Sequence, residues 1–378
     1  MNLVSFDVET TTINNGDPYH PDNRLVQVGF YNPVDQHTLF YKDKIHVESI
    51  RKLLYESVLI GANLKFDLAW MERVGIDTKR LKVYDVQLAE FIISNQSKIM
   101  PSLDYMAEKY LGQHKVDNIK LNYWDKGIDT WFVPEEELTT YLKEDLRLTY
   151  EVFLKQQEIL KQTGRWNLFK LQSLDLPILG NMEWNGIPFE KEKSVESGNE
   201  LSRTIEETRA RIVRYSDCPS FNCGSGDHVS ALLYGGTIRH EYRVPIGVFK
   251  SGAKLGQPRY KVMLEEFNQV QLVSPLKGSE LKKEGYWSTD EQTLSSLKPK
   301  TKEIRELIKD IQDLSKLEKL QQTYYFGIPK LMDEKGWGNH MHGKFNQCVA
   351  RTGRLSSSEP NLQNMDKNLA GLCYSEYD

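Results

Sequence analysis

Alternating apolar and polar positions mark the first part of the chain as β-structure. Residues 3–9 alternate up to a threonine-rich turn, residues 25–31 form a hairpin partner, and residues 38–41 and 58–61 add two short strands. Helical spacing of apolar residues fills most of the remaining sequence, over 47–56, 65–74, 85–94, 102–110 and 135–162. Strands and helices in this order predict a mixed sheet flanked by helices, an α/β (α+β) domain.

The pattern changes near Gly164 to long helices. Apolar residues recur every three or four positions over 168–184, 190–215 and 302–325, and the last stripe is typical of an antiparallel helical pair. Residues 235–287 are instead rich in Gly, Pro and Lys with β-like runs, which predicts an inserted hairpin-and-loop module. We therefore expect a first domain at 1–163, followed by a mainly helical region with the inserted module at about 235–287.

Composition places the chain among soluble globular proteins. It has 378 residues, of which 39% are hydrophobic and 27% charged, with no apolar run near the roughly 20 residues that span a bilayer. Asp7 interrupts the start of the chain, so we expect no signal peptide. Four cysteines at irregular spacing predict a reducing, cytoplasmic location. A zinc site at His340, His342 and Cys348 is the weaker alternative to buried thiols and exposed imidazoles.

The net charge of −4 conceals an asymmetry between the two halves of the chain. Residues 1–160 hold 18 Lys and Arg against 25 Asp and Glu, a balance of −7. Residues 161–378 hold 31 against 28, a balance of +3. This distribution favours carboxylate chemistry in the first half and phosphate contact in the second.

The candidate chemistry is a set of four carboxylates and a phenol. Asp7 and Glu9 share one face of the first strand because strand side chains alternate. Asp67 lies at a strand-to-helix junction, and Tyr141 and Asp145 share a helical face at i, i+4 spacing. Such a cage suits two Mg²⁺ or Mn²⁺ ions, which prefer oxygen ligands and support phosphodiester hydrolysis. The alternative is that these acids cap helices or face solvent.

These motifs resemble, in order and approximate spacing, the DEDDy subclass of 3′→5′ exonucleases and their ribonuclease H-like fold. The resemblance implies that Asp7 bridges both metals and that Glu9 and Asp145 bind the water-activating metal. It also implies that Asp67 holds the second metal through water and that Tyr141 positions the nucleophile.

Further residues accompany this set. The resemblance implies that Asn63 and Phe66, in the motif Asn-x-x-Phe-Asp, line the site and contact substrate. Asp85 is best explained as a helix N-cap. Three aromatic residues could stack on a frayed base or belong to the core, namely Trp124, Trp131 and Phe132.

Residues 352–364, Thr-Gly-Arg-Leu-Ser-Ser-Ser-Glu-Pro-Asn-Leu-Gln-Asn, resemble the signature that leads from thumb into palm in family-A DNA polymerases. Softer landmarks of the same family occur at 171–188, 221–229, 288–291 and 342–347. The resemblance covers nearly the whole chain except 235–287, and it leans towards phage-type members, for which the expected location is the host cytoplasm. It implies a mainly helical thumb at 164–338 followed by the start of a palm at 339–378, so that three domains are expected in all.

The signature segment carries groups suited to holding a primer–template duplex. Arg354 can donate to minor-groove acceptors, which every base pair offers, so this contact is insensitive to sequence. Neutral donors for phosphates, sugars and base edges are supplied by Ser356, Asn361, Gln363 and Asn364. The lysine-rich helix at 302–319 either attracts the DNA backbone or is a solvated face.

Only 14 residues (378 − 364) follow the signature, and the palm carboxylate and fingers motifs of the family do not occur in them. We therefore expect a proofreading 3′→5′ exonuclease that binds primer–template DNA and does not synthesise DNA unaided. The remaining palm and fingers would come from a second polypeptide, or the chain is truncated. Two alternatives stay open: a stand-alone ribonuclease D-like exonuclease, and a non-catalytic DNA-binding subunit of a split polymerase.

Overall fold

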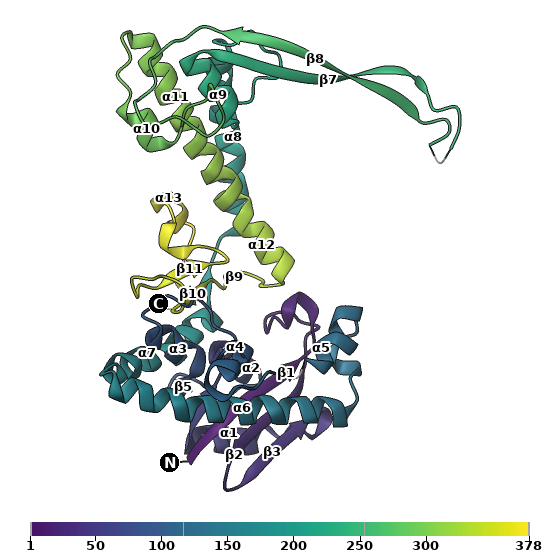
Figure 1. The fold of residues 1–378 in the computed structure, drawn as a ribbon, viewed down its shortest axis with the longest axis vertical. Helices are drawn as coiled ribbons and strands as arrows, with labels where there is room; N and C mark the ends of the chain where they lie inside the picture. Colours follow the sequence, from purple (N-terminus) through teal and green to yellow (C-terminus); the bar gives the residue numbers. More distant parts are fainter. Residues whose placement is uncertain (1, 116, 253, 377–378) are drawn as a thin grey trace. The chain divides into compact units, whose positions relative to one another are not determined.

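The structure is a computed structural model that describes residues 2–115, 117–252 and 254–376 (Figure 1). The chain divides into two compact units. The first unit comprises Met1–Lys191 together with Ile328–Asp378, and the second unit comprises Glu192–Gly327. Within the described residues, no helix is long and apolar enough to cross a membrane.

A five-stranded mixed sheet forms the centre of the first unit and confirms the predicted fold class. The strands are β1 (Asn2–Thr10), β2 (Leu25–Asn32), β3 (Gln36–Tyr41), β4 (Ser57–Gly61) and β5 (Lys82–Asp85). Their order is β3-β2-β1-β4-β5. β1 pairs antiparallel with β2 and parallel with β4, so the strand that carries Asp7 and Glu9 lies in the middle of the sheet.

Helices flank this sheet. They are α1 (Val47–Glu56), α2 (Leu64–Arg73), α3 (Val86–Ile93), α4 (Leu103–Leu111), α5 (Asn118–Asn122), α6 (Glu135–Gln162) and α7 (Trp166–Asn185). Short 3₁₀ turns occur at Ile13–Asn15, Lys42–Lys44, Trp124–Lys126 and Thr130–Phe132. α6 runs along the sheet (Figure 1), and its Val152, Phe153 and Leu160 join the core formed by strand residues such as Phe6 and Val28.

The last part of the chain belongs to the first unit. β9 (His340–Met341) pairs with β6 (Ile187–Pro188), and β10 (Lys344–Asn346) pairs with β11 (Ser356–Ser358). α12 (Gly327–Lys335), the 3₁₀ turn η6 (Leu362–Asn364) and α13 (Lys367–Ala370) complete this region. Lys65 of α2 forms an ion pair with Oε1 of Glu183 of α7. The backbone amide of Phe345 in β10 donates a hydrogen bond to the same oxygen over 2.6 Å.

The second unit consists of helices and a hairpin. α8 (Lys191–Val213) and α11 (Lys302–Lys319) pack antiparallel, with Arg211 paired to Asp310 and Arg209 to Glu318, which agrees with the predicted helical pair. α9 (Gly226–Tyr234), α10 (Glu291–Ser296) and the π-helical turn Leu320–Tyr325 are the other helical elements. The predicted insertion contains a long antiparallel hairpin of β7 (Gly236–Val248) and β8 (Pro258–Gln269), visible in Figure 1.

The two compact units do not coincide with the three expected domains. α7 packs against α2 and β5 of the sheet domain, although the predicted boundary at 163 precedes it. Compactness groups elements by packing, whereas the expected boundary at 163 follows the change of pattern near Gly164 and the one at 338 follows the family resemblance. The three-domain division therefore stays a prediction.

Candidate active site

Strand β1 and helix α6 bring three carboxylates together. Asp7 and Glu9 point from β1, and Asp145 points from α6 one turn after Tyr141. One ligand oxygen from each of the three acids lies within 4.8 Å of the others. Glu9 and Asp145 are buried, at 8% and 4% exposed, and Asp7 is half-buried. The alternation of the strand and the i, i+4 spacing of the helix thus converge on one place.

Asp67 joins this group from the first turn of α2. It is 3% exposed, and its Oδ1 accepts a hydrogen bond from the Val8 amide over 3.2 Å. The Asp7 carboxylate accepts from the same amide over 3.0 Å and is hydrogen-bonded to Asp67. α2 begins at Asn63, whose φ of 62° turns the chain sharply from β4 into the helix. This turn places Asp67 beside β1.

A lysine that the sequence did not single out completes the site. Lys115 lies on the loop after α4, and its ammonium forms an ion pair with Oδ2 of Asp145. The same ammonium is 4.5 Å from the centroid of the Tyr141 ring and hydrogen-bonds to the Tyr141 hydroxyl. Its side chain is 21% exposed. A single lysine in a polar loop forms no motif, so no sequence signal marked it.

Burial dominates the protonation of the site. It raises the pKa of Asp145 to about 7, with the charge of Lys115 opposing the rise. Burial, reinforced by the charges of Asp7 and Asp145, also raises the pKa of Glu9 well above its usual range. The pKa of Asp67 is raised well above its usual range by burial and by the charge of Asp7. Buried carboxylates that lie this close together repel one another when ionised, so binding a cation stabilises their charged forms.

The donor set fits a divalent cation. Oδ1 of Asp145 is buried and has no hydrogen-bond partner among the described residues, while Oδ2 of the same carboxylate is held by Lys115. A buried oxygen without a partner beside two further carboxylates is what a hard, oxygen-preferring ion requires. Among the described residues, His340, His342 and Cys348 form no such group, so the zinc alternative gains no support.

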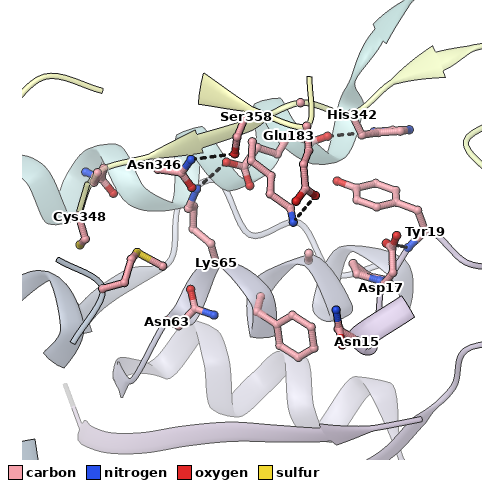
Figure 2. A pocket seen from close by; sticks show the side chains of 18 of the residues that line it. Asn15, Asp17, Tyr19, Asn63, Lys65, Glu183, His342, Asn346, Cys348 and Ser358 are labelled. Carbon is pink, nitrogen blue, oxygen red and sulfur yellow. Dashed lines mark hydrogen bonds and ion pairs between the residues drawn. The ribbon is translucent and has the colours of Figure 1, made fainter. Parts of the chain in front are cut away.

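Two cavities share wall residues in this region, and one of them is lined by the acids. Asp7, Lys115 and Asp145 line a cavity of about 220 Å³ together with Asn63 and Gln87. Asn63 and Gln87 also line a second cavity of about 430 Å³, whose wall includes Phe66. Figure 2 shows this second cavity with Asn63, Lys65 and Tyr19 around it. Of the two expected substrate contacts, Asn63 therefore shares a cavity with Asp7 and Asp145, whereas Phe66 lines the second cavity only.

The other candidates of this domain are explained by local contacts. Asp85 accepts the Leu88 amide over 3.0 Å and the Leu64 amide over 2.7 Å, which confirms the predicted N-cap. Trp124 packs edge-on against Tyr141 at 5.9 Å, and Lys42 lies over the Trp131 ring at 4.8 Å. Phe132, by contrast, is 73% exposed. Of the three aromatic residues, Phe132 alone is mainly solvent-exposed.

The expected duplex contacts lie elsewhere, in the segment from β11 to η6. Arg354 is exposed and Ser356 is half-buried at the start of β11. Asn361 accepts the Gln363 amide over 3.2 Å, and the Gln363 side chain donates to the Leu355 carbonyl over 3.2 Å. Asn364 ends the turn. Asn361 and Gln363 thus shape the segment, and among the described residues the cavity of the carboxylates is lined by none of these five.

Comparison with known proteins agrees with both halves of this description. Residues 1–161 match the family described as 3′-5′ exonuclease, and residues 259–371 match DNA polymerase family A. A DNA polymerase I from Borreliella burgdorferi is 29% identical over 89% of this chain and 32% of its own length. A DNA-directed DNA polymerase from Pseudomonas phage M6 is 23% identical over 81% of this chain and 41% of its own length.

The fold is also similar to a solved structure, the POL domain of Pol1 from M. smegmatis in complex with DNA primer-template and dNTP. The TM-score is 0.65 at 15% identity, over 96% of this chain and 52% of that one. The first unit thus contains a 3′-5′ exonuclease domain with a buried acidic centre. A further part of the chain, residues 259–371, is similar to the family-A DNA polymerases, and the chain spans about a third of the length of the Borreliella relative.

Proposed function

We propose that this chain removes nucleotides from the 3′ end of DNA by metal-dependent hydrolysis, the proofreading reaction. The observation that carries the proposal is the cluster of Asp7, Glu9 and Asp145 within 4.8 Å, with a buried and unpartnered Asp145 oxygen, inside a domain matched as a 3′-5′ exonuclease. Asp67 beside Asp7 supplies the fourth carboxylate.

In this proposal Asp7, Glu9 and Asp145 hold one Mg²⁺ or Mn²⁺ ion, and Asp7 with Asp67 holds a second. Bound divalent ions would activate water and offset charge on the leaving 3′ oxygen. Burial and the charge of Asp145 raise the pKa of Tyr141, so its phenol stays protonated at neutral pH and orients the attacking water instead of deprotonating it. Asn63 and Phe66 would bind the terminal nucleotide, since Asn63 lines the cavity of Asp7 and Asp145 and Phe66 lines the second cavity, which Asn63 also lines.

For the polymerase-like region we propose primer–template binding through Arg354, Ser356, Asn361, Gln363 and Asn364. Exposed Arg354 supports this role, because a cation on the surface can reach the duplex without unfolding the segment. We further propose that this chain is part of a phage-type polymerase whose remaining palm and fingers lie on a second polypeptide, and that primer extension needs both. Primer extension by this chain alone would refute the need for a partner. Failure of a second polypeptide to co-purify would refute the split arrangement.

The test is digestion of a 5′-labelled single-stranded oligonucleotide and a primer–template with Mg²⁺ or Mn²⁺ and without dNTPs. We expect a ladder of shortened products, abolished by EDTA and reduced at least about 1,000-fold by Asp7→Ala, because the carboxylate shared by both ions is lost. Absence of a ladder with either metal would refute the nuclease and favour a DNA-binding subunit.

The match over residues 259–371 speaks against a stand-alone ribonuclease D-like enzyme. Faster digestion of an RNA oligonucleotide than of a DNA oligonucleotide of the same sequence would favour the ribonuclease D-like enzyme instead.

A further inference from the structure

The Lys115 ammonium is a cation inside an otherwise acidic site. It lines the same cavity as Asp7 and Asp145 and contacts both functional groups that α6 contributes, the Asp145 carboxylate and the Tyr141 hydroxyl. The carboxylates and the phenol account for metal binding and water orientation without it. Its position therefore calls for a role of its own.

The two oxygens of Asp145 have different surroundings. Oδ2 is bound by the Lys115 ammonium, whereas Oδ1 is buried and, within the part of the chain that the structure describes, has no hydrogen-bond partner. A lysine that bound both oxygens would compete with a metal ion for the carboxylate. Held by one oxygen only, the carboxylate is fixed in rotation about its last bond while the other oxygen stays available. Lys115 and a cation can thus use Asp145 at the same time.

The loop that carries Lys115 is fixed to the helices around it. The Lys115 amide donates to Asp104 of α4 over 2.8 Å. Two residues earlier, Gln113 accepts from Arg147 of α6 over 2.7 Å, and Arg147 is itself held by Glu144 and Glu151. The ammonium consequently approaches α6 from a backbone anchored at two points. Such anchoring is what distinguishes a built contact from a passing surface ion pair.

We propose that Lys115 is a positioning residue of the exonuclease site, orienting Asp145 so that Oδ1 faces the metal and holding the Tyr141 hydroxyl in the same arrangement. This inference rests on the proposed function. Because the ammonium donates to the Tyr141 oxygen, the phenol's own proton is directed away from Lys115 and is available to the attacking water. Lys115 itself touches neither the metal nor the substrate in this role.

The test compares Lys115→Met, which removes the charge at similar length, with Lys115→Arg, which keeps it. Lys120→Met on the nearby α5 is the matched control, because Lys120 is exposed. Three quantities are measured: Mn²⁺ affinity by paramagnetic titration without DNA, the single-turnover cleavage rate at saturating oligonucleotide, and oligonucleotide affinity in Ca²⁺. Thermal unfolding in EDTA confirms that each variant is folded.

We expect Lys115→Met to weaken Mn²⁺ binding by about 10- to 100-fold and to slow cleavage by at least as much, as other losses of an outer-shell partner do. Oligonucleotide affinity should stay within about threefold, Lys115→Arg should recover part of both losses, and Lys120→Met should match the wild type. Unchanged Mn²⁺ affinity and rate in Lys115→Met would overturn the proposal. So would a fall in oligonucleotide affinity as large as the fall in rate, which would make Lys115 a phosphate contact.

The metal titration needs no catalysis, so the two proposals can fail separately. Wild-type protein that binds Mn²⁺ but leaves DNA intact would refute the exonuclease, and the Lys115 comparison could still be read. If Lys115→Met does not fold, Lys115→Arg against wild type decides, with reduced Mn²⁺ affinity expected and equal affinity and rate contradicting the proposal.

Discussion

Glu9 is buried beside Asp7 and Asp145, and repulsion within this group acts on the stability of the metal-free protein. Its pKa is raised well above 4.5 by burial and by both neighbouring charges. A carboxyl with a raised native pKa stabilises the fold fully below its unfolded pKa, and this stability is lost as pH rises through the native pKa. The metal-free protein should therefore lose stability from about pH 4.5 upward, over the range in which Glu9 ionises.

Because ionised Glu9 destabilises the metal-free fold, Glu9→Gln, which removes the charge and keeps the shape, should stabilise it. In EDTA at pH 8 we expect its melting temperature to exceed that of the wild type by about 2–4 °C, equivalent to about 1 kcal/mol. Differential scanning calorimetry from pH 4 to pH 8 measures the difference, which should vanish at the acidic end. Mg²⁺ should raise the melting temperature of the wild type more than that of the variant. A lower melting temperature for Glu9→Gln at pH 8 in EDTA contradicts the argument.

At the same scale, the residues found by sequence and the one missed differ for a physical reason. Asp7 with Glu9, and Tyr141 with Asp145, each repeat with the period of the element that carries them, so their shared faces follow from spacing alone. Lys115 reaches Asp145 from a loop, 30 positions earlier (145 − 115). Its place depends on how the loop is anchored to α4 and α6, and periodicity holds no information about that.

Among the elements, α6 approaches the sheet closely because β2 carries a glycine opposite it. A Cβ built on Gly29 would lie 2.7 Å from Leu146 Cδ1 and 2.9 Å from Leu142 Cδ2. Both leucines flank Tyr141 and Asp145 on α6. The depth at which the helix seats thus depends on the absence of one side chain from β2.

Gly29→Ala should therefore disturb both stability and the site. We expect a loss of about 1–3 kcal/mol from overpacking, because the leucines must shift to admit the methyl group. Cleavage should slow by at least about tenfold as Tyr141 and Asp145 move with the helix. Urea unfolding and single-turnover digestion measure the two effects. Gly180→Ala on α7 is the control, since its Cβ would meet no atom closer than 3.8 Å. Equal behaviour of the two variants would show that α6 tolerates displacement.

Element prediction succeeded where a segment carries its own periodicity. Helices α1 and α6 begin and end at the predicted residues, and the predicted strands at 25–31 and 38–41 lie within β2 and β3. Strand β5, at Lys82–Asp85, was not among the predicted strands. Its strand character comes from parallel pairing with β4, a non-local contact.

For the molecule as a whole, packing groups the sequence differently from the resemblance. The Glu183 carboxylate, 15% exposed on its side chain, binds Lys65 of α2 and the Phe345 amide of β10. One ion pair therefore connects the sheet domain, α7 and the polymerase-like segment within the first unit. The sequence could not reveal this, because the three contributors are separated by 118 and 162 positions.

The β7–β8 hairpin of the second unit presents the opposite case, a long element with little burial. Ile238 near its base is 1% exposed and packs with Cys218 and Ala231. Beyond the pair of Arg239 with Glu266, the strand residues are mostly exposed. The outer part of the hairpin consequently contributes few buried contacts. The loss of stability on removing it depends on how much of it is buried and not on the length of its strands.

Replacing residues 240–265 with an Asn-Gly turn between Arg239 and Glu266 should thus leave the protein intact. We expect a melting temperature within about 2 °C of the wild type and single-strand cleavage within about twofold, since the exonuclease carboxylates all lie in the other unit. Ile238→Ala at the buried base is the contrasting variant and should cost about 2–4 kcal/mol. Calorimetry and oligonucleotide digestion measure both. A truncated hairpin that melts as early as Ile238→Ala would mean that its outer strands stabilise the second unit.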